Sequence, residues 1–222
     1  MTAPRAVLSW SSGKDCCHAL HICRRDGIAD IQALLTTVNE EFNRVAMHGT
    51  RQTLLEAQAR AVGLPLIEVA LPWPCTNDEY EARMAKACAD IVAQGITHIV
   101  FGDLFLEDVR DYRIEKLKGT GLTPIFPLFG SDTTALAHEM FASGLKARIV
   151  TCDPRKVPEA TAGRLFDSDL LADLPDGVDP CGENGEFHSA VFDSPEFAAP
   201  IAHEVGQTVT RDGFVYADMI PV

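Results

Sequence analysis

The chain has 222 residues, of which 46% are hydrophobic and 23% charged, and its formal net charge at pH 7 is -13. This length suits one α/β domain with a small addition, and the composition is that of a globular protein. The acidic balance argues against an extended nucleic-acid surface, because clustered Lys and Arg side chains hold the phosphate backbone. The sequence also has no apolar run near the roughly 20 residues of a membrane helix.

The cysteines and the first residues favour the cytoplasm. Seven cysteines, an odd number, lie mostly within predicted helices and strands, a pattern that favours free thiols in a reducing compartment. The first five residues lead directly into an apolar strand, without the features of a signal peptide. We therefore expect a cytoplasmic protein without a structural disulfide, and a homodimer is slightly favoured.

The first two thirds of the chain alternate between apolar strands and amphipathic helices. The predicted elements are a strand at 6–10, a helix at 16–25, a strand at 31–38, a helix at 50–62, a strand at 66–71, a helix from 76 to about 94, a strand at 96–101, helices at 109–118 and 133–142, and a strand at 147–152. Thr76 and Glu79 have the spacing of a capping box, and Gly95 is placed to end that helix. Such alternation is typical of a parallel sheet with helices on both faces.

The pattern changes after about residue 155. Two short helices and three strands are predicted there, at 159–166, 169–174, 187–192, 201–210 and 214–220. Asp212 and Gly213 form a strong signal for a two-residue hairpin turn between the last two strands. We therefore predict an α/β core at residues 1–155 and a smaller α+β subdomain at residues 156–222.

The loop at residues 11–15, Ser-Ser-Gly-Lys-Asp, follows the first strand and precedes the first helix. In an open parallel sheet, ligands bind at the carboxyl ends of the strands, and a helix N-terminus offers N–H groups to an anion. We expect Lys14 and Asp15 to lie in an exposed loop that contacts phosphate. Taken alone, this loop could equally be a simple helix cap.

A second polar segment runs from Asp179 to Ser189 and combines two glycines with Glu183, Glu186 and His188. The glycines permit a tight backbone path, and the carboxylates and the imidazole could bind a cation, hold an amine or transfer a proton. Taken alone, an acidic surface turn remains the alternative.

Together the two segments resemble a known family. Residues 11–16 are similar to the pyrophosphate loop Ser-Gly-Gly-x-Asp-Ser of the ATP pyrophosphatases, or adenine nucleotide alpha hydrolases, with Ser12 replacing a glycine and Cys16 replacing a serine. Cys-Gly-Glu-Asn-Gly-Glu-Phe-His at 181–188 closely resembles the signature of the diphthine-ammonia ligase family in that superfamily. The blocks at 101–110 and 121–130 also look like that family, so the resemblance extends from about residue 5 to residue 192.

The resemblance implies the superfamily's parallel sheet with a small C-terminal subdomain, and it also implies site residues. The residues around the phosphates of ATP would be Ser11, Ser12, Gly13, Lys14, Asp15 and Asp103. The substrate side would be formed by Arg110, Glu183, Asn184, Glu186 and His188, and the catalytic residues would be Lys14, Asp15, Glu186 and His188. Mg²⁺ is the metal expected with ATP, because it bridges phosphate oxygens and needs few protein ligands, so no separate protein metal site is predicted.

The reaction implied by the resemblance is ATP-dependent amide formation. A carboxylate attacks the α phosphate, pyrophosphate leaves, and ammonia displaces AMP from the acyl-adenylate; no glutaminase domain fits in the chain, so the ammonia would be free. The family's acceptor is the diphthine carboxylate of translation elongation factor 2, and a small molecule is the other candidate. A thiolation substrate is disfavoured by the missing Cys-x-x-Cys pair, and a sensor that binds ATP without turnover is a third alternative.

The remaining histidines and cysteines are assigned to packing or to the surface. Five of them share one predicted helix, but adjacent positions point to different faces and no second ligand pair follows at zinc spacing; they are Cys16, Cys17, His18, His21 and Cys23. The isolated histidines are His48, His98, His138 and His203. Trp73, between two prolines, could stack on a substrate, but we expect it to anchor a packed loop.

Overall fold

The computed structural model describes residues 2–45 and 49–222, so His48 lies outside the described residues. In chain order the elements are β1 (Arg5–Ser9), α1 (Lys14–Asp26), β2 (Asp30–Asn39), β3 (Arg44–Val45), α2 (Gln52–Val62), β4 (Leu66–Leu71), α3 (Asn77–Ala93), β5 (His98–Val100), α4 (Glu107–Leu117), β6 (Thr123–Ile125), α5 (Thr133–Ser143), β7 (Lys146–Cys152), a 3-10 turn (Glu159–Thr161), α6 (Ser168–Asp173), β8 (Phe187–Asp193), β9 (His203–Arg211) and β10 (Phe214–Pro221).

Six strands form the first sheet, called sheet A here, with β1 near its centre. The order is β3-β2-β1-β5-β6, and β4 also pairs with β2. Every pair is parallel except β2 with the two-residue strand β3. The predicted α/β fold with a largely parallel sheet is therefore confirmed.

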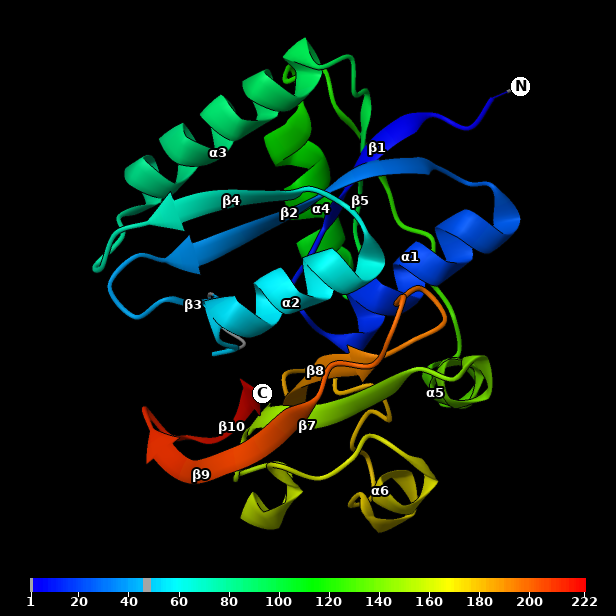
Figure 1. The fold of residues 1–222 in the computed structure, drawn as a ribbon, viewed down its shortest axis with the longest axis vertical. Coiled ribbons are helices and arrows are strands. Elements are labelled where there is room, and N and C mark those ends of the chain that lie inside the picture. Colours follow the sequence, from blue (N-terminus) through cyan, green and yellow to red (C-terminus); the bar gives the residue numbers. More distant parts are fainter. Residues whose placement is uncertain (1, 46–48) are drawn as a thin grey trace.

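Helices cover both faces of sheet A, with α3 and α4 on one face and α1 and α2 on the other (Figure 1). The alternation of β1 side chains shows how the sequence achieves this arrangement. Val7 packs in the hydrophobic cluster that contains Ile91 of α3, whereas Leu8 packs in the cluster that contains Leu20 of α1 and Leu55 of α2. The sequence of a strand that is buried on both faces in this way is a continuous run of apolar residues.

A second, antiparallel sheet, called sheet B, has the order β8-β7-β10-β9. Helices α1 and α2 lie between the two sheets, and α6 lies beyond sheet B (Figure 1). The two sheets share a core, because Leu20 of α1 belongs to the same buried cluster as Ile149 of β7 and Phe187 of β8. The predicted small α+β unit packed on the core is thus present.

The structure corrects the placement of β7. The sequence grouped this strand with the parallel series, but it pairs antiparallel with β8 and β10 in sheet B. The reason is that β7 is buried along most of its length, and a fully buried antiparallel strand has the same apolar pattern as a parallel one. The division at residue 155 stays a prediction, and β7 lies on its N-terminal side.

Several local signals are confirmed. Thr76 and Glu79 form the capping box of α3: the Thr76 N–H donates to Glu79 Oε2 at 3.0 Å and the Glu79 N–H to Thr76 Oγ1 at 3.3 Å. Asp212 and Gly213 both have positive φ, as the predicted two-residue turn between β9 and β10 requires. The strands β3 and β6, of two and three residues, are too short to give a periodic signal.

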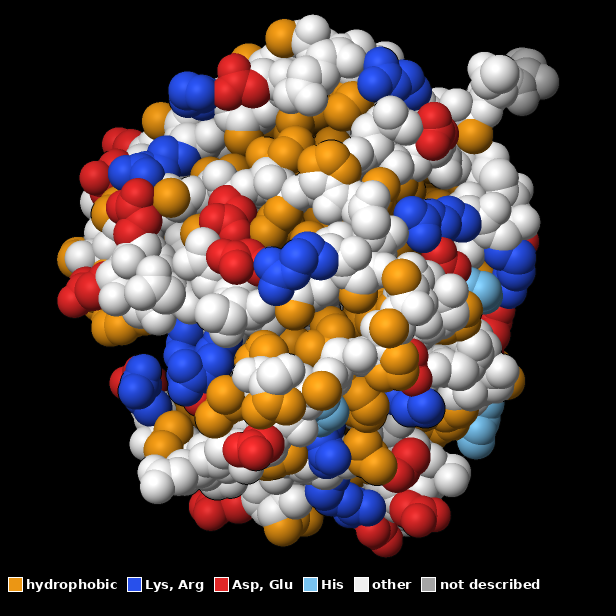
Figure 2. Space-filling model, viewed as in Figure 1, with side chains coloured by type: hydrophobic (Ala, Val, Ile, Leu, Met, Phe, Trp, Pro, Cys, Tyr) orange, Lys and Arg blue, Asp and Glu red, His pale blue; other side chains and the backbone are white. Residues whose placement is uncertain are grey.

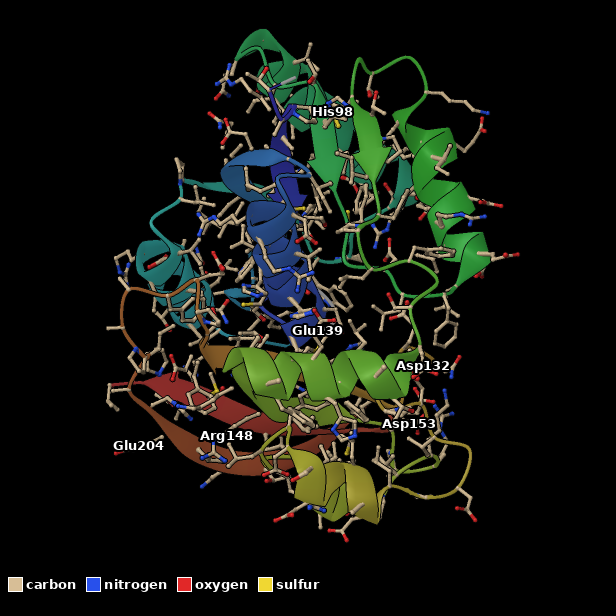
Figure 3. All side chains as sticks on the ribbon, turned by 90° about the vertical axis from the view of Figure 1, so that its right-hand side faces the viewer. His98, Asp132, Glu139, Arg148, Asp153 and Glu204 are labelled. Carbon is tan, nitrogen blue, oxygen red and sulfur yellow. The ribbon has the colours of Figure 1, made fainter. Side chains whose placement is uncertain are left out.

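The clustered Cys and His side chains of α1 serve mainly in packing, since Cys16, Cys17, His18 and Cys23 are all buried. Within residues 2–45 and 49–222, no group of three or more His, Cys, Asp or Glu side chains is placed to hold a metal ion. Helix α5 lies next to α1. Its Glu139 faces α1 (Figure 3) and accepts a hydrogen bond from Arg25 Nη1 at 2.7 Å.

Trp73 is less packed than expected, because its side chain is 62% exposed and its ring neighbour is Phe42. His98 and His203 are hydrogen-bonded within the protein, at 2.8 Å to Thr97 Oγ1 and at 2.9 Å to Arg148 Nε respectively. On the face drawn in Figure 2, acidic and basic side chains are interspersed, and Lys and Arg do not gather in one field. In the part of the chain that is described, no helix has both the length and the apolar character needed to cross a membrane.

Candidate active site

The loop between β1 and α1 is held in place by buried contacts. Ser12 has a φ of 72° and is fully buried, and its Oγ donates to Thr50 Oγ1 at 2.8 Å. Its carbonyl oxygen accepts the N–H of Val191 and the side-chain amide of Gln58, both at 3.0 Å. The Ser12 hydroxyl thus holds the loop against Thr50. Contact of the Ser12 backbone with phosphate stays a prediction.

The expectation that Lys14 lies in an exposed loop is wrong. Its side chain is 2% exposed. Nζ donates to both carboxylate oxygens of Asp15, at 2.9 Å each, and also to the carbonyl of Cys181. The ammonium also lies 5.3 Å from the ring centre of Phe166 and 5.7 Å from that of Phe187. Burial alone would lower the pKa of Lys14, but the Asp15 carboxylate holds it above its ordinary value. Lys14 therefore stays charged and ties α1 to the segment before β8.

Two close approaches fix the start of α1. Gly13 is its N-cap residue and supplies no side-chain cap, while Ser189 of β8 accepts the Lys14 N–H at 3.1 Å. A Cβ atom on Gly102, just after β5, would lie 2.9 Å from the Asp15 carbonyl carbon. Only glycine lets the end of β5 approach α1 this closely, so the loops after β1 and β5 meet at one edge of sheet A.

The acidic turn before β8 is organised around Glu186, which is 3% exposed. Its Oε1 accepts the Asp179 N–H at 3.3 Å and the Asn184 side-chain amide at 3.2 Å, and Asp179 Oδ2 accepts the Glu183 N–H at 2.8 Å. Among the described residues, Glu186 Oε2 is buried without a hydrogen-bond partner. The structure thus gives Glu186 a place inside the turn, and Asn184 is exposed.

Glu183 reaches out of this turn toward the loop after β5. Its Oε1 accepts the N–H of Leu104 at 2.8 Å, and the side chain remains partly exposed. Burial raises the pKa of Glu183 to about 7, opposed by the Leu104 N–H and Lys14 and assisted by Asp15 and Asp103. The carboxyl group therefore changes its protonation state near neutral pH.

Asp103 is paired with a residue that the sequence reading missed. Arg113 of α4 donates to its two carboxylate oxygens at 2.6 and 3.0 Å, and the guanidinium lies 4.4 Å from the ring centre of Phe101. The predicted Arg110 instead donates to Asp111 and lies 4.5 Å from the ring centre of Phe129. Arg113 follows Arg110 by three residues on one helix, and this proximity was the only sequence signal for it.

A cavity of about 780 Å³ opens at the carboxyl edge of sheet A, beneath α3 and α4. Its walls are mostly apolar, and they include Ser11, Leu35, Thr36, Thr37, Leu71, Met84, Phe101, Tyr112, Arg113, Leu117 and His188. Burial, with a smaller effect of Lys14, lowers the pKa of His188 to about 4, so its ring is neutral at pH 7.

Six of the eleven predicted residues fall into two groups. Ser11 and His188 line the cavity. Beside it, Lys14, Asp15 and Glu183 interact electrostatically, and Asp103 interacts in the same way with Glu183. The residue that spans the two groups is Arg113, which lines the cavity and pairs with Asp103.

Comparison with known proteins places the chain in a family. The diphthamide synthase N-terminal domain matches residues 4–122, and the diphthamide synthase C-terminal domain matches residues 132–211. The chain belongs to the diphthamide synthase family. Its two matched parts include the loop at 11–15 and the acidic turn at 179–189, the two segments on which the resemblance was based, which is thereby confirmed.

Proteins similar to the chain over most of its length bear the name diphthine–ammonia ligase. The protein from Danio rerio is 25% identical over 96% of this chain and 91% of its own length. Those from Rattus norvegicus and Homo sapiens are 24% and 23% identical, each over 93% of this chain and 85% of the relative. The similarity to these named ligases therefore extends over the sequence that forms both sheets.

Proposed function

We propose that the chain is an ATP-dependent ligase that activates a carboxylate as an acyl-adenylate and transfers it to ammonia, releasing AMP and pyrophosphate. The observation that carries the proposal is the cavity at the carboxyl edge of a parallel sheet, bounded by Ser11 of the loop after β1. This edge is where open α/β sheets bind nucleotides. The volume of about 780 Å³ lies in the range of small-molecule sites.

In this proposal the apolar walls of the cavity hold the base and sugar, and the loop at 11–15 faces the phosphates. Backbone N–H groups at the start of α1 and the helix dipole favour an anion there. Arg113 places a positive group on the cavity wall, and its pairing with Asp103 and its contact with the Phe101 ring orient its guanidinium. Such preorganised charge stabilises negative charge that develops on a leaving group.

Mg²⁺ with ATP fits these residues. The ion usually keeps several waters and binds through phosphate oxygens with one or two carboxylates. Asp15 and Asp103, which pair with Lys14 and Arg113 in this structure, would supply hard oxygen ligands beside the phosphate loop, and a dedicated three-ligand site is not needed. When bound, the ion would neutralise phosphate charge; the chain's own residues would orient the α phosphate and exclude water.

The acceptor is proposed from the names of the relatives. Diphthine is the substrate that those names state, and we propose the diphthine carboxylate of elongation factor 2 as the acceptor, with a small carboxylate as the alternative. The acidic turn packs against the phosphate loop through Lys14 and the Cys181 carbonyl, so that an acceptor bound beside the turn would lie close to the α phosphate.

Product analysis tests the proposal. The purified chain is incubated with ATP, Mg²⁺, ammonium and elongation factor 2 that carries diphthine, and nucleotides are resolved by chromatography while the acceptor is analysed by mass spectrometry. We expect AMP and pyrophosphate in equal amounts with the amide. ADP with phosphate would refute the AMP-forming reaction, and tight ATP binding without any product with either acceptor class would favour the sensor.

A further inference from the structure

We propose that Glu183 is the base that takes a proton from an ammonium ion and so generates the ammonia nucleophile. The inference rests on the proposed amidation and names the residue that would activate its nitrogen substrate. It differs from the role that the sequence suggested, in which Glu183 bound the acceptor and His188 or Glu186 carried the chemistry.

The geometry singles out Glu183 among the carboxylates of the site. Glu186 is buried inside the turn, and Asp103 is held by two hydrogen bonds from Arg113. Asp15 is bound through both oxygens to the Lys14 ammonium. Glu183 has one oxygen anchored by the Leu104 N–H, and in the described part of the chain its Oε2 accepts no hydrogen bond, while the side chain stays partly exposed.

The contacts of Glu183 bring it close to the loop at 11–15, where the proposed function puts the phosphates. The Leu104 hydrogen bond fixes it against the loop after β5, and Gly102 of that loop touches the backbone of Asp15 in the phosphate loop. The turn that carries Glu183 is closely packed, because Gly182 lies so near Phe187 that a Cβ atom would be 2.8 Å from the Phe187 carbonyl oxygen. Asp15 and Asp103 nearby add negative charge that favours a cation.

The proposed step balances as follows. The Glu183 carboxylate takes one proton from ammonium, and the freed lone pair of ammonia forms the C–N bond with the acyl carbon. The C–O bond to the adenylate phosphate breaks, AMP leaves with the electron pair, and the nitrogen loses a further proton to solvent to give the amide. The pKa of Glu183, raised by burial to about 7, suits a group that must accept and release a proton near neutral pH.

The test compares two nucleophiles on Glu183→Gln. The glutamine oxygen can still accept the Leu104 N–H, so the turn should keep its conformation. We expect this variant to retain acceptor-dependent exchange of pyrophosphate into ATP, which needs no nitrogen substrate. Amidation with ammonium at neutral pH should fall about a hundredfold or more. Hydroxylamine, which is largely unprotonated at this pH, should restore most of the rate as hydroxamate. Asp176→Asn, at an exposed carboxylate just before the turn, is the control and should match wild type.

The outcomes separate the inference from the proposed function. Absence of pyrophosphate exchange in the wild type would refute the proposed function. Normal amidation by Glu183→Gln would refute the inference alone. An equal loss of rate with ammonium and hydroxylamine would also refute it, because a structural or adenylation role does not depend on the protonation of the attacking nitrogen. The wild-type rate with ammonium should also fall as pH drops below about 7, and protonation of Glu183 should account for part of this fall. The variant should lack that contribution.

Discussion

We expect His18 of α1 to make the fold less stable in acid. Its side chain is fully buried, and among the described residues neither ring nitrogen has a hydrogen-bond partner. The nearest carboxylate oxygen, Oε2 of Glu139 on α5, lies 3.9 Å from Nε2. Burial lowers the pKa of His18 from 6.5 to about 4, opposed by Glu139 and assisted by His21 and Arg25.

The sign and size of the effect follow from linkage. Because the folded pKa lies below the unfolded one, the unfolded chain binds the proton more tightly, and stability falls as pH drops from about 6.5 to about 4. The full difference corresponds to roughly 3.4 kcal/mol. At pH 5, where the unfolded side chain is mostly protonated and the folded one is not, the loss should be about 2 kcal/mol relative to neutral pH.

The assay is urea unfolding of wild type and His18→Leu at about pH 7.5 and at pH 5, followed by circular dichroism. Leucine removes the titrating group and the two unpaired nitrogens. From pH 7.5 to pH 5, the free energy of unfolding of the variant should therefore fall by about 2 kcal/mol less than that of wild type. His138→Gln, at an exposed histidine of α5, is the control and should follow wild type. A parallel fall in wild type and His18→Leu would refute the reasoning.

Three further predictions concern the loop and its neighbours. In urea unfolding, the free energy of unfolding of Ser12→Gly should exceed that of Ser12→Ala by about 1–2 kcal/mol. Both variants lose the Thr50 contact, but only glycine accepts the φ of 72° without strain, and equal urea midpoints would contradict this. Lys14→Met should lower the free energy of unfolding by roughly 3 kcal/mol, because Asp15 and the Cys181 carbonyl lose their buried donor, and an unchanged urea midpoint would speak against it. Arg113→Lys should weaken binding of a non-hydrolysable ATP analogue about tenfold in calorimetric titration, whereas Arg110→Lys should not. Weaker binding by Arg110→Lys alone would contradict the placement of ATP beside Arg113.

The sequence predicted most of the elements because their signals are local. The alternation of Val7 and Leu8 between two clusters, the capping box at Thr76 and the positive φ of Asp212 and Gly213 depend on a few neighbouring residues. The partner of a strand is not a local property. For this reason the strand predicted at 147–152 was found within one residue of its observed bounds, Lys146–Cys152, but was assigned to the wrong sheet.

The site was only partly predictable for the same reason. Motifs identified Lys14 and Glu183, but the burial of Lys14 depends on the Cys181 carbonyl, 167 residues away. Arg113 belongs to the cavity because α4 turns back over the end of β5, and no motif marks that ion pair. Sequence patterns therefore named the segments that meet at the site, while the contacts between those segments decided which side chains remain available for chemistry.

The two departures from the family loop, at Ser12 and Cys16, concern side chains that are directed into the protein. The Cys16 thiol donates to the Gly13 carbonyl at 3.1 Å and lies 3.5 Å from Ser11 Oγ, and burial raises its pKa to about 11, so it stays protonated. Ser12 occupies a left-handed position that glycine would accept more easily, and its contacts with Thr50 and Gln58 offset the strain. A hydroxyl at position 16 could make the same inward contact as the thiol. The replacements therefore concern how the loop is held against α1 and α2, and they do not alter its backbone N–H groups.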